Sequence, residues 1–99
     1  MNGMNVTEIG EAVRVTVGFE PAAMLRDRKG MPFPHHKIRP RSFVWRNREY
    51  EVGEITYVWR ESIGDAFVYH FAVTESGNVF ELCFNNSTMN WTLANVAHE

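Results

Sequence analysis

Basic and aromatic side chains alternate through the middle of the chain, and this combination could bind a phosphate backbone and stack on bases. The residues that could do so are Lys37, Arg39, Arg41, Trp45, Arg46 and Arg48, with Phe33 and Phe43 among them. Basic groups contact phosphate oxygens, and stacking of an aromatic ring on a base contributes roughly 1–3 kcal/mol. On a β-strand, positions 37, 39 and 41 would share one face and form a short cationic stripe.

A solvated rim is the alternative interpretation of these cations. Arg46 and Arg48 could pair across a hairpin with Glu49, Glu51 or Glu54, and exposed ion pairs of this kind contribute little to stability. The overall formal charge of −2 also weakens the case for nucleic acid.

The charge is distributed unevenly along the chain. Residues 26–48 hold eight of the ten basic residues and only one acid, Asp27, so this segment carries +7. The remaining residues have two basic and eleven acidic side chains and carry −9. Such blocks of charge are typical of a partner surface, or of a chain whose halves attract each other.

The four histidines and the single cysteine show no recognisable metal or catalytic motif. His-x-His, Cys-x-x-Cys and His-Glu-x-x-His spacings are all missing, and a zinc site joining His35, His36 or His70 to Cys83 would need a coincidence of folding. His70 and Cys83 fall at the centres of two expected neighbouring strands, on comparable faces. A thiol there more often packs as a small apolar group than acts as a nucleophile. We therefore expect no catalytic residue, no metal ligand and no cofactor.

Alternation of apolar and polar residues predicts the elements that must position these side chains. Strands are expected over residues 12–19, from 37 or 41 to 45, and over 49–59, 67–74, 79–84 and 91–96. Turns are expected at 46–48, 61–65, 75–78 and 85–88. Residues 20–30 could be a short helix or a loop, and the prolines at 32 and 34 make 31–36 irregular.

One expected strand changes phase in its middle. Tyr50 and Val52 share a face, whereas Ile55, Tyr57 and Trp59 have the opposite parity. The simplest explanation is a β-bulge at Gly53-Glu54, which would let a long strand curl around a core. A plain strand with aromatic residues on both faces is the alternative.

These elements predict a mainly β fold, namely an antiparallel meander of five to six strands with at most one short helix. A half-open barrel is one form that such a sheet could take. The 99 residues are expected to form a single domain, with residues 1–10 loosely held and 20–36 as an irregular connection. Aromatic residues exceed what one face of a small sheet usually needs, and the surplus could form a homodimer or a partner interface. They are Trp45, Tyr50, Tyr57, Trp59, Phe67, Tyr69, Phe71 and Trp91.

The order of several short motifs resembles a group of small bacterial β-domains. The run Trp45-Arg-Asn-Arg-Glu-Tyr50-Glu-Val52 matches their Trp-Arg-x-Arg-x-Tyr-x-Val hairpin. A later Phe-Glu-Leu strand, ending at Leu82, and a terminal Trp91-Thr-Leu93 follow in the same order. The resemblance covers about residues 37–96 and implies a bacterial or phage source. Some members of the group are associated with proteins of DNA repair synthesis, and the resemblance implies no particular activity.

These observations favour a non-catalytic protein-interaction module with an unknown protein partner. The alternative is a nucleic-acid-binding module that uses the basic segment 37–48. A third reading is a small enzyme or ligand-binding domain, with a pocket framed by Tyr50, Tyr57, His70 and Glu81. With one cysteine, no signal peptide and no apolar run of membrane-spanning length, we expect a cytoplasmic protein without membrane contact.

Overall fold

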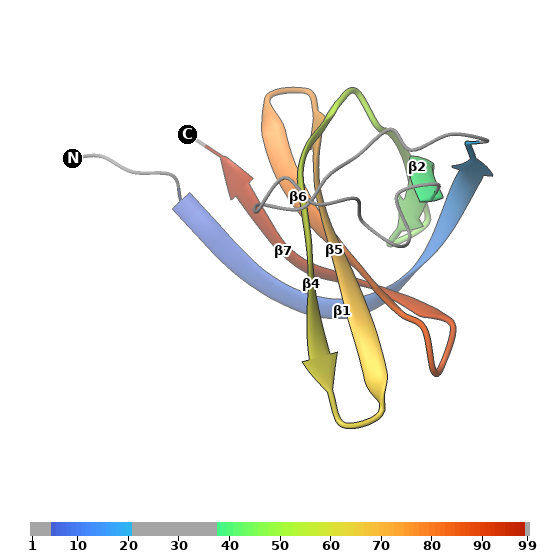
Figure 1. Cartoon of the computed structure of the whole chain (residues 1–99). Helices are drawn as coiled ribbons and strands as arrows, with labels where there is room; N and C mark the ends of the chain where they lie inside the picture. Colours follow the sequence, from blue (N-terminus) through green and yellow to red (C-terminus); the bar gives the residue numbers. More distant parts are fainter. Residues whose placement is uncertain (1–4, 21–37, 99) are drawn as a thin grey trace.

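Seven β-strands account for nearly all of the described chain. The computed structural model describes residues 5–20 and 38–98, so the expected helix or loop at 20–30 and the irregular segment at 31–36 lie almost entirely outside it. The strands are β1 (Asn5–Phe19), β2 (Ile38–Trp45), β3 (Arg48–Glu51), β4 (Ile55–Ile63), β5 (Ala66–Glu75), β6 (Asn78–Asn85) and β7 (Asn90–His98). They form one antiparallel sheet in the order β3-β2-β1-β7-β6-β5-β4 (Figure 1). Over the described ranges, no helix is long and apolar enough to span a membrane.

The prediction of a mainly β, antiparallel fold is confirmed. The sheet has seven strands, one more than predicted, because one of the expected strands is divided into two. The strand predicted over 49–59 divides into β3 and β4, which lie at opposite edges of the sheet. Val52 N donates to the carbonyl of Arg41 in β2 at 2.9 Å, and Gly53 N donates to the carbonyl of Thr74 in β5 at 2.7 Å. The phase change at Gly53-Glu54 therefore reflects a change of hydrogen-bonding partner.

Gly53 is suited to this crossing because the backbone of β5 comes very close. A Cβ at position 53 would lie 3.0 Å from Thr74 Oγ1 and 3.2 Å from the Thr74 carbonyl oxygen. The bulge predicted at Gly53-Glu54 occurs slightly later, where the register shifts between Ile55 and Tyr57. Both edges of the sheet are thus drawn together at one end, and the sheet curls.

β1 is much longer than predicted and pairs with two different strands. Its first half, from Asn5 to Val13, pairs with β7, and its second half, from Arg14 to Phe19, pairs with β2. Residues 5–10, expected to be loosely held, thus belong to the sheet. Gly10 has a φ of +66° at the register shift between Glu8 and Glu11, and this bend helps to give β1 its curved course (Figure 1).

The hydrophobic core fills the concave side of the curled sheet and joins strands that are not neighbours. The ring of Phe80 in β6 lies 5.1 Å from Phe43 in β2 and 5.3 Å from Tyr50 in β3, measured between centroids. Leu82 and Leu93 are fully buried beside them. Aromatic residues occupy both faces of the sheet, so most of the predicted surplus is used within the fold.

Replacing Phe43 by alanine tests whether this shared core holds the two ends of the sheet together. Phe43 is 1% exposed, and we expect Phe43→Ala to lower the free energy of unfolding by about 3–5 kcal/mol because it leaves a cavity against Phe80. Phe19, which is 73% exposed, is the matched control, and Phe19→Ala should change the free energy of unfolding by less than about 0.5 kcal/mol. Urea denaturation measures both; equal effects would contradict the shared core.

Candidate functional site

The predicted basic residues lie on the β2–β3 hairpin, apart from Lys37, which is outside the described residues. Arg39 is half-buried in β2, and the exposed Arg41 binds Glu20 at 3.2 Å. Arg46 and Asn47 form a two-residue turn with φ values of 53° and 65°, and Arg48 begins β3. The hairpin predicted across residues 46–48 is therefore confirmed.

Glu11 of β1 holds the end of this hairpin. Its Oε1 accepts hydrogen bonds from Trp45 Nε1 at 2.8 Å and from Arg46 Nε at 3.2 Å, and its Oε2 accepts one from Arg46 Nη2 at 2.6 Å. The bonds from Arg46 and Trp45 hold the pKa of Glu11 below its ordinary value. The alternative interpretation paired Arg46 with an acid of its own hairpin, whereas the structure pairs it with Glu11 of the neighbouring strand β1.

Two guanidinium groups cover aromatic rings on the hairpin. Arg46 lies 4.7 Å over the ring of Trp45, and Arg48 lies 4.8 Å over the ring of Tyr50. Tyr50 is also stacked on Phe43, with ring centroids 5.0 Å apart and planes 8° apart. We call Trp45, Arg46, Arg48 and Tyr50 the Arg–Trp cluster. Its side chains are ordered by one another and by Glu11.

A second group of polar residues lies on the outer face of the sheet, opposite the core. Trp59 of β4 pairs with His70 of β5, and His70 pairs with Cys83 of β6, so the register places the three in one row. The Trp59 and His70 rings are stacked at 4.7 Å and 5°. The expectation that His70 and Cys83 share a face of neighbouring strands is confirmed.

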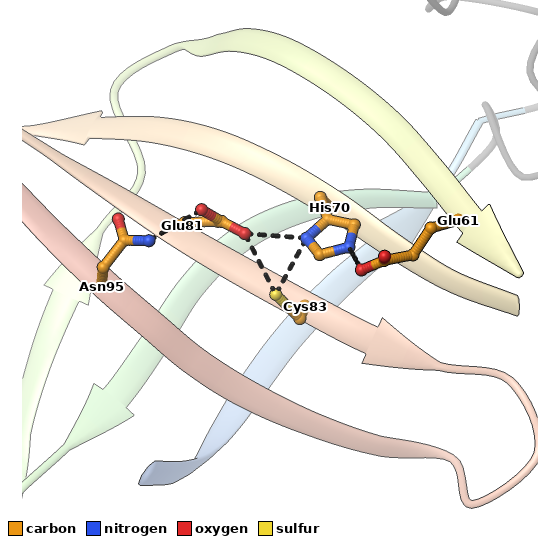
Figure 2. A network of polar contacts seen from close by, with 5 residues as sticks. All are labelled: Glu61, His70, Glu81, Cys83 and Asn95. Atoms are coloured by element: carbon orange, nitrogen blue, oxygen red, sulfur yellow. Dashed lines mark hydrogen bonds and ion pairs between the residues drawn. The ribbon is translucent and has the colours of Figure 1, made fainter. Parts of the chain in front are cut away.

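His70 is the centre of a network of polar contacts (Figure 2). Its Nε2 lies 2.7 Å from Glu61 Oε1, and its Nδ1 lies 2.8 Å from Glu81 Oε2. The Sγ of Cys83 lies 3.2 Å from the same Nδ1 and donates to Glu81 Oε2 at 3.5 Å. Asn95 of β7 donates to the other oxygen of Glu81 at 2.8 Å. We call these five residues the His70 network.

The His70 network contains a thiol, an imidazole and a carboxylate in the order found in cysteine hydrolases. The thiol, however, is not activated. Burial and the charges of Glu81 and Glu61 raise the pKa of Cys83 to about 12, so the thiol stays protonated at neutral pH. Glu81 Oε2 already lies at hydrogen-bonding distance from Nδ1 of His70, the ring nitrogen that would otherwise stabilise a thiolate at Cys83. This arrangement does not favour nucleophilic catalysis.

The same residues could hold a metal ion. One ligand atom each of His70, Glu81 and Cys83 lies within 4.8 Å of the others. Sequence reasoning found His70 and Cys83 but placed Glu61 in a turn. Glu61 reaches the ring because β4 continues to Ile63, and the turn is confined to Gly64 and Asp65. Asn95 was missed because its position opposite Glu81 depends on the β6–β7 register.

Thiol alkylation across pH tests the environment of Cys83 in protein dialysed against a chelator. Since the raised pKa leaves almost no thiolate, we expect negligible reaction with iodoacetamide between about pH 7 and 9, where an ordinary thiol of pKa about 8.5 reacts. Glu81→Gln removes a negative charge, which lowers the pKa and should speed alkylation at pH 9. Glu51→Gln, at an exposed position of β3, is the control. A wild-type profile with its midpoint near 8.5 would contradict this account.

The chain was compared with protein families, with curated proteins and with solved structures. Neither the curated proteins nor the solved structures gave a match. One family matches residues 4–98, which includes every strand of the sheet and both the Arg–Trp cluster and the His70 network. The chain therefore belongs to the family described as "Domain of unknown function (DUF6504)".

Proposed function

We propose that this domain is a non-catalytic protein-interaction module that binds its partner through the Arg–Trp cluster. The observation that carries the proposal is the triple hydrogen bonding of Glu11 to Trp45 and Arg46, which orders the end of the hairpin before any partner arrives. Tryptophan, tyrosine and arginine are the residues most enriched among those that dominate binding energy at protein interfaces.

Order in the unbound state supports binding because side chains that are already fixed lose less entropy at an interface. The Arg46 side chain remains 64% exposed while it is held by Glu11, so its remaining N–H groups can still reach a partner. Arg48 forms no ion pair with any residue of the described ranges, and it offers a second guanidinium. A partner surface that combines carboxylates with apolar groups would match this cluster.

Nucleic-acid binding by residues 37–48 is the alternative function, and two features disfavour it. Arg41 and Arg46 are each paired with a glutamate, which reduces the charge available for phosphate. The rings of Trp45 and Tyr50 are covered by guanidinium groups, so a base could stack only by displacing them.

A small enzyme or ligand-binding domain is the third reading. Its expected pocket is disfavoured because Tyr50 packs on Phe80 in the core, whereas His70 and Glu81 lie on the outer face. The protonated thiol of Cys83 gives an enzymatic function no support either.

Charge reversal at the Arg–Trp cluster tests the protein partner. Tagged wild-type protein expressed in its source cells should retain a partner in stoichiometric amount, and Arg48→Glu should lose it because the new charge repels carboxylates. Arg60→Glu is the matched control, since the exposed Arg60 of β4 lies over the ring of Phe67 in β5, outside the cluster. Quantitative mass spectrometry measures the retained proteins. Identical profiles for wild type and Arg48→Glu would overturn the proposal, and light scattering tests whether the partner is a second copy of this chain.

A salt titration with a labelled single-stranded oligonucleotide tests the alternative. If phosphate contacts are absent, fluorescence anisotropy should show no saturable binding even at about 50 mM salt, where phosphate-dependent affinity is strong. If the oligonucleotide binds, its binding weakens steeply with salt and it is lost in Arg48→Glu, then the partner of the cluster is nucleic acid and the proposed protein partner is wrong.

A further inference from the structure

We propose that His70, Glu81 and Cys83 form a zinc site, with Zn²⁺ bound by His70 Nδ1, Glu81 Oε2 and Cys83 Sγ. The three atoms converge from two adjacent strands, β5 and β6 (Figure 2). The nitrogen lies 2.8 Å from the oxygen and 3.2 Å from the sulfur, and the sulfur lies 3.5 Å from the oxygen. The site lies on different strands from the Arg–Trp cluster, so it stands independently of the proposed interaction.

The spacing of these atoms is close to that of a tetrahedral zinc site. Zn–N, Zn–O and Zn–S bonds of about 2.0–2.3 Å at tetrahedral angles place the ligand atoms about 3.4–3.6 Å apart. The sulfur–oxygen distance of 3.5 Å already matches, while the nitrogen–sulfur distance of 3.2 Å must open by about 0.3 Å and the nitrogen–oxygen distance of 2.8 Å by about 0.6 Å. In the proposed site, rotations of the Glu81 and Cys83 side chains move the oxygen and the sulfur away from Nδ1 while the imidazole stays in place.

The residues around the three ligands are those that a zinc site requires. A histidine that binds metal through one nitrogen usually donates its other N–H to a carboxylate, and Glu61 accepts such a bond from Nε2 at 2.7 Å. A carboxylate ligand is itself usually hydrogen-bonded, and Asn95 donates to the oxygen of Glu81 that faces away from the cluster. The stacked ring of Trp59 further fixes the plane of the imidazole.

The chemistry of the ligands selects the metal. A thiolate and an imidazole favour Zn²⁺ over Mg²⁺ or Ca²⁺, which require mainly oxygen ligands. Cys83 would lose its proton to solvent on binding, and the dication would neutralise the thiolate and the Glu81 carboxylate together. His70 and Cys83 are 8% and 9% exposed, so two of the three ligands are largely shielded from solvent. Three protein ligands leave the fourth position for water.

A metal-free ion-pair network is the rival explanation. In that case both ring nitrogens of His70 would donate hydrogen bonds, one to Glu61 and one to Glu81, and the thiol of Cys83 would have no part in the network. This explanation requires no role for sulfur. The zinc site requires Cys83 as a ligand, so the two differ in whether the thiolate bonds to an added metal.

Titration of the full chain with Co²⁺ and Zn²⁺, after dialysis against a chelator, tests the site. We expect one ion per chain and a thiolate-to-cobalt charge-transfer absorption band. Cys83→Ser should abolish the band and weaken Zn²⁺ binding at least tenfold. Glu61→Gln should weaken Zn²⁺ binding by about 10–100-fold and keep the band, because Glu61 orients a ligand without being one. Isothermal titration calorimetry measures the affinities, and circular dichroism checks that each variant is folded.

Matched controls test whether histidines outside the proposed site bind the metal ion. The double variant His35→Gln/His36→Gln and the single variant His98→Gln should bind Zn²⁺ with wild-type affinity and keep the cobalt band. The proposal is overturned if Co²⁺ gives no thiolate band in the wild type, if Glu61→Gln binds as tightly as the wild type, or if binding is lost in the histidine controls.

Discussion

The change of hydrogen-bonding partner at residues 52–54 is the constraint on which the rest of the structure depends. Val52 bonds to β2 and Gly53 bonds to β5, so two strands at opposite edges of the sheet are joined by a direct chain connection. The sheet must curl for this short link to span it. Curling brings Phe43 and Tyr50 onto Phe80 and creates one enclosed core. It also turns the other face outward, where polar side chains gather.

The two candidate sites depend on different consequences of this curled sheet. On the outer face, β4, β5 and β6 align Trp59, His70 and Cys83 in a row, so the Trp59 ring stacks on the His70 imidazole and covers it. The charge of Glu81 disfavours a thiolate in the metal-free protein, and the same charge would attract a cation. The Arg–Trp cluster depends instead on β1, because Glu11 reaches the hairpin from the neighbouring strand.

Local patterns in the sequence predicted most strands and turns, and long-range pairing accounts for what they missed. Alternation located β5 and β6 and the strands that flank the Arg46-Asn47 turn, and Gly77, which tolerates a positive φ, located the second hairpin. The phase change at Gly53-Glu54 marks the place where β3 and β4 divide, but it does not show that the chain moves there to Thr74 of β5, about twenty positions away. Glu11 and Glu61 were missed as partners for the same reason, since each reaches its partner only after distant strands have paired.

The pairing of β1 with β7 also has a consequence for synthesis on the ribosome. Asn5 lies opposite His98, so the first half of the earliest strand finds its partner among residues that are translated after all the other strands. Until then, the backbone N–H and C=O groups of that half are an open edge, which could pair with other chains. Glu8 places a negative charge along this edge, and like charges on two nascent chains would discourage them from joining there.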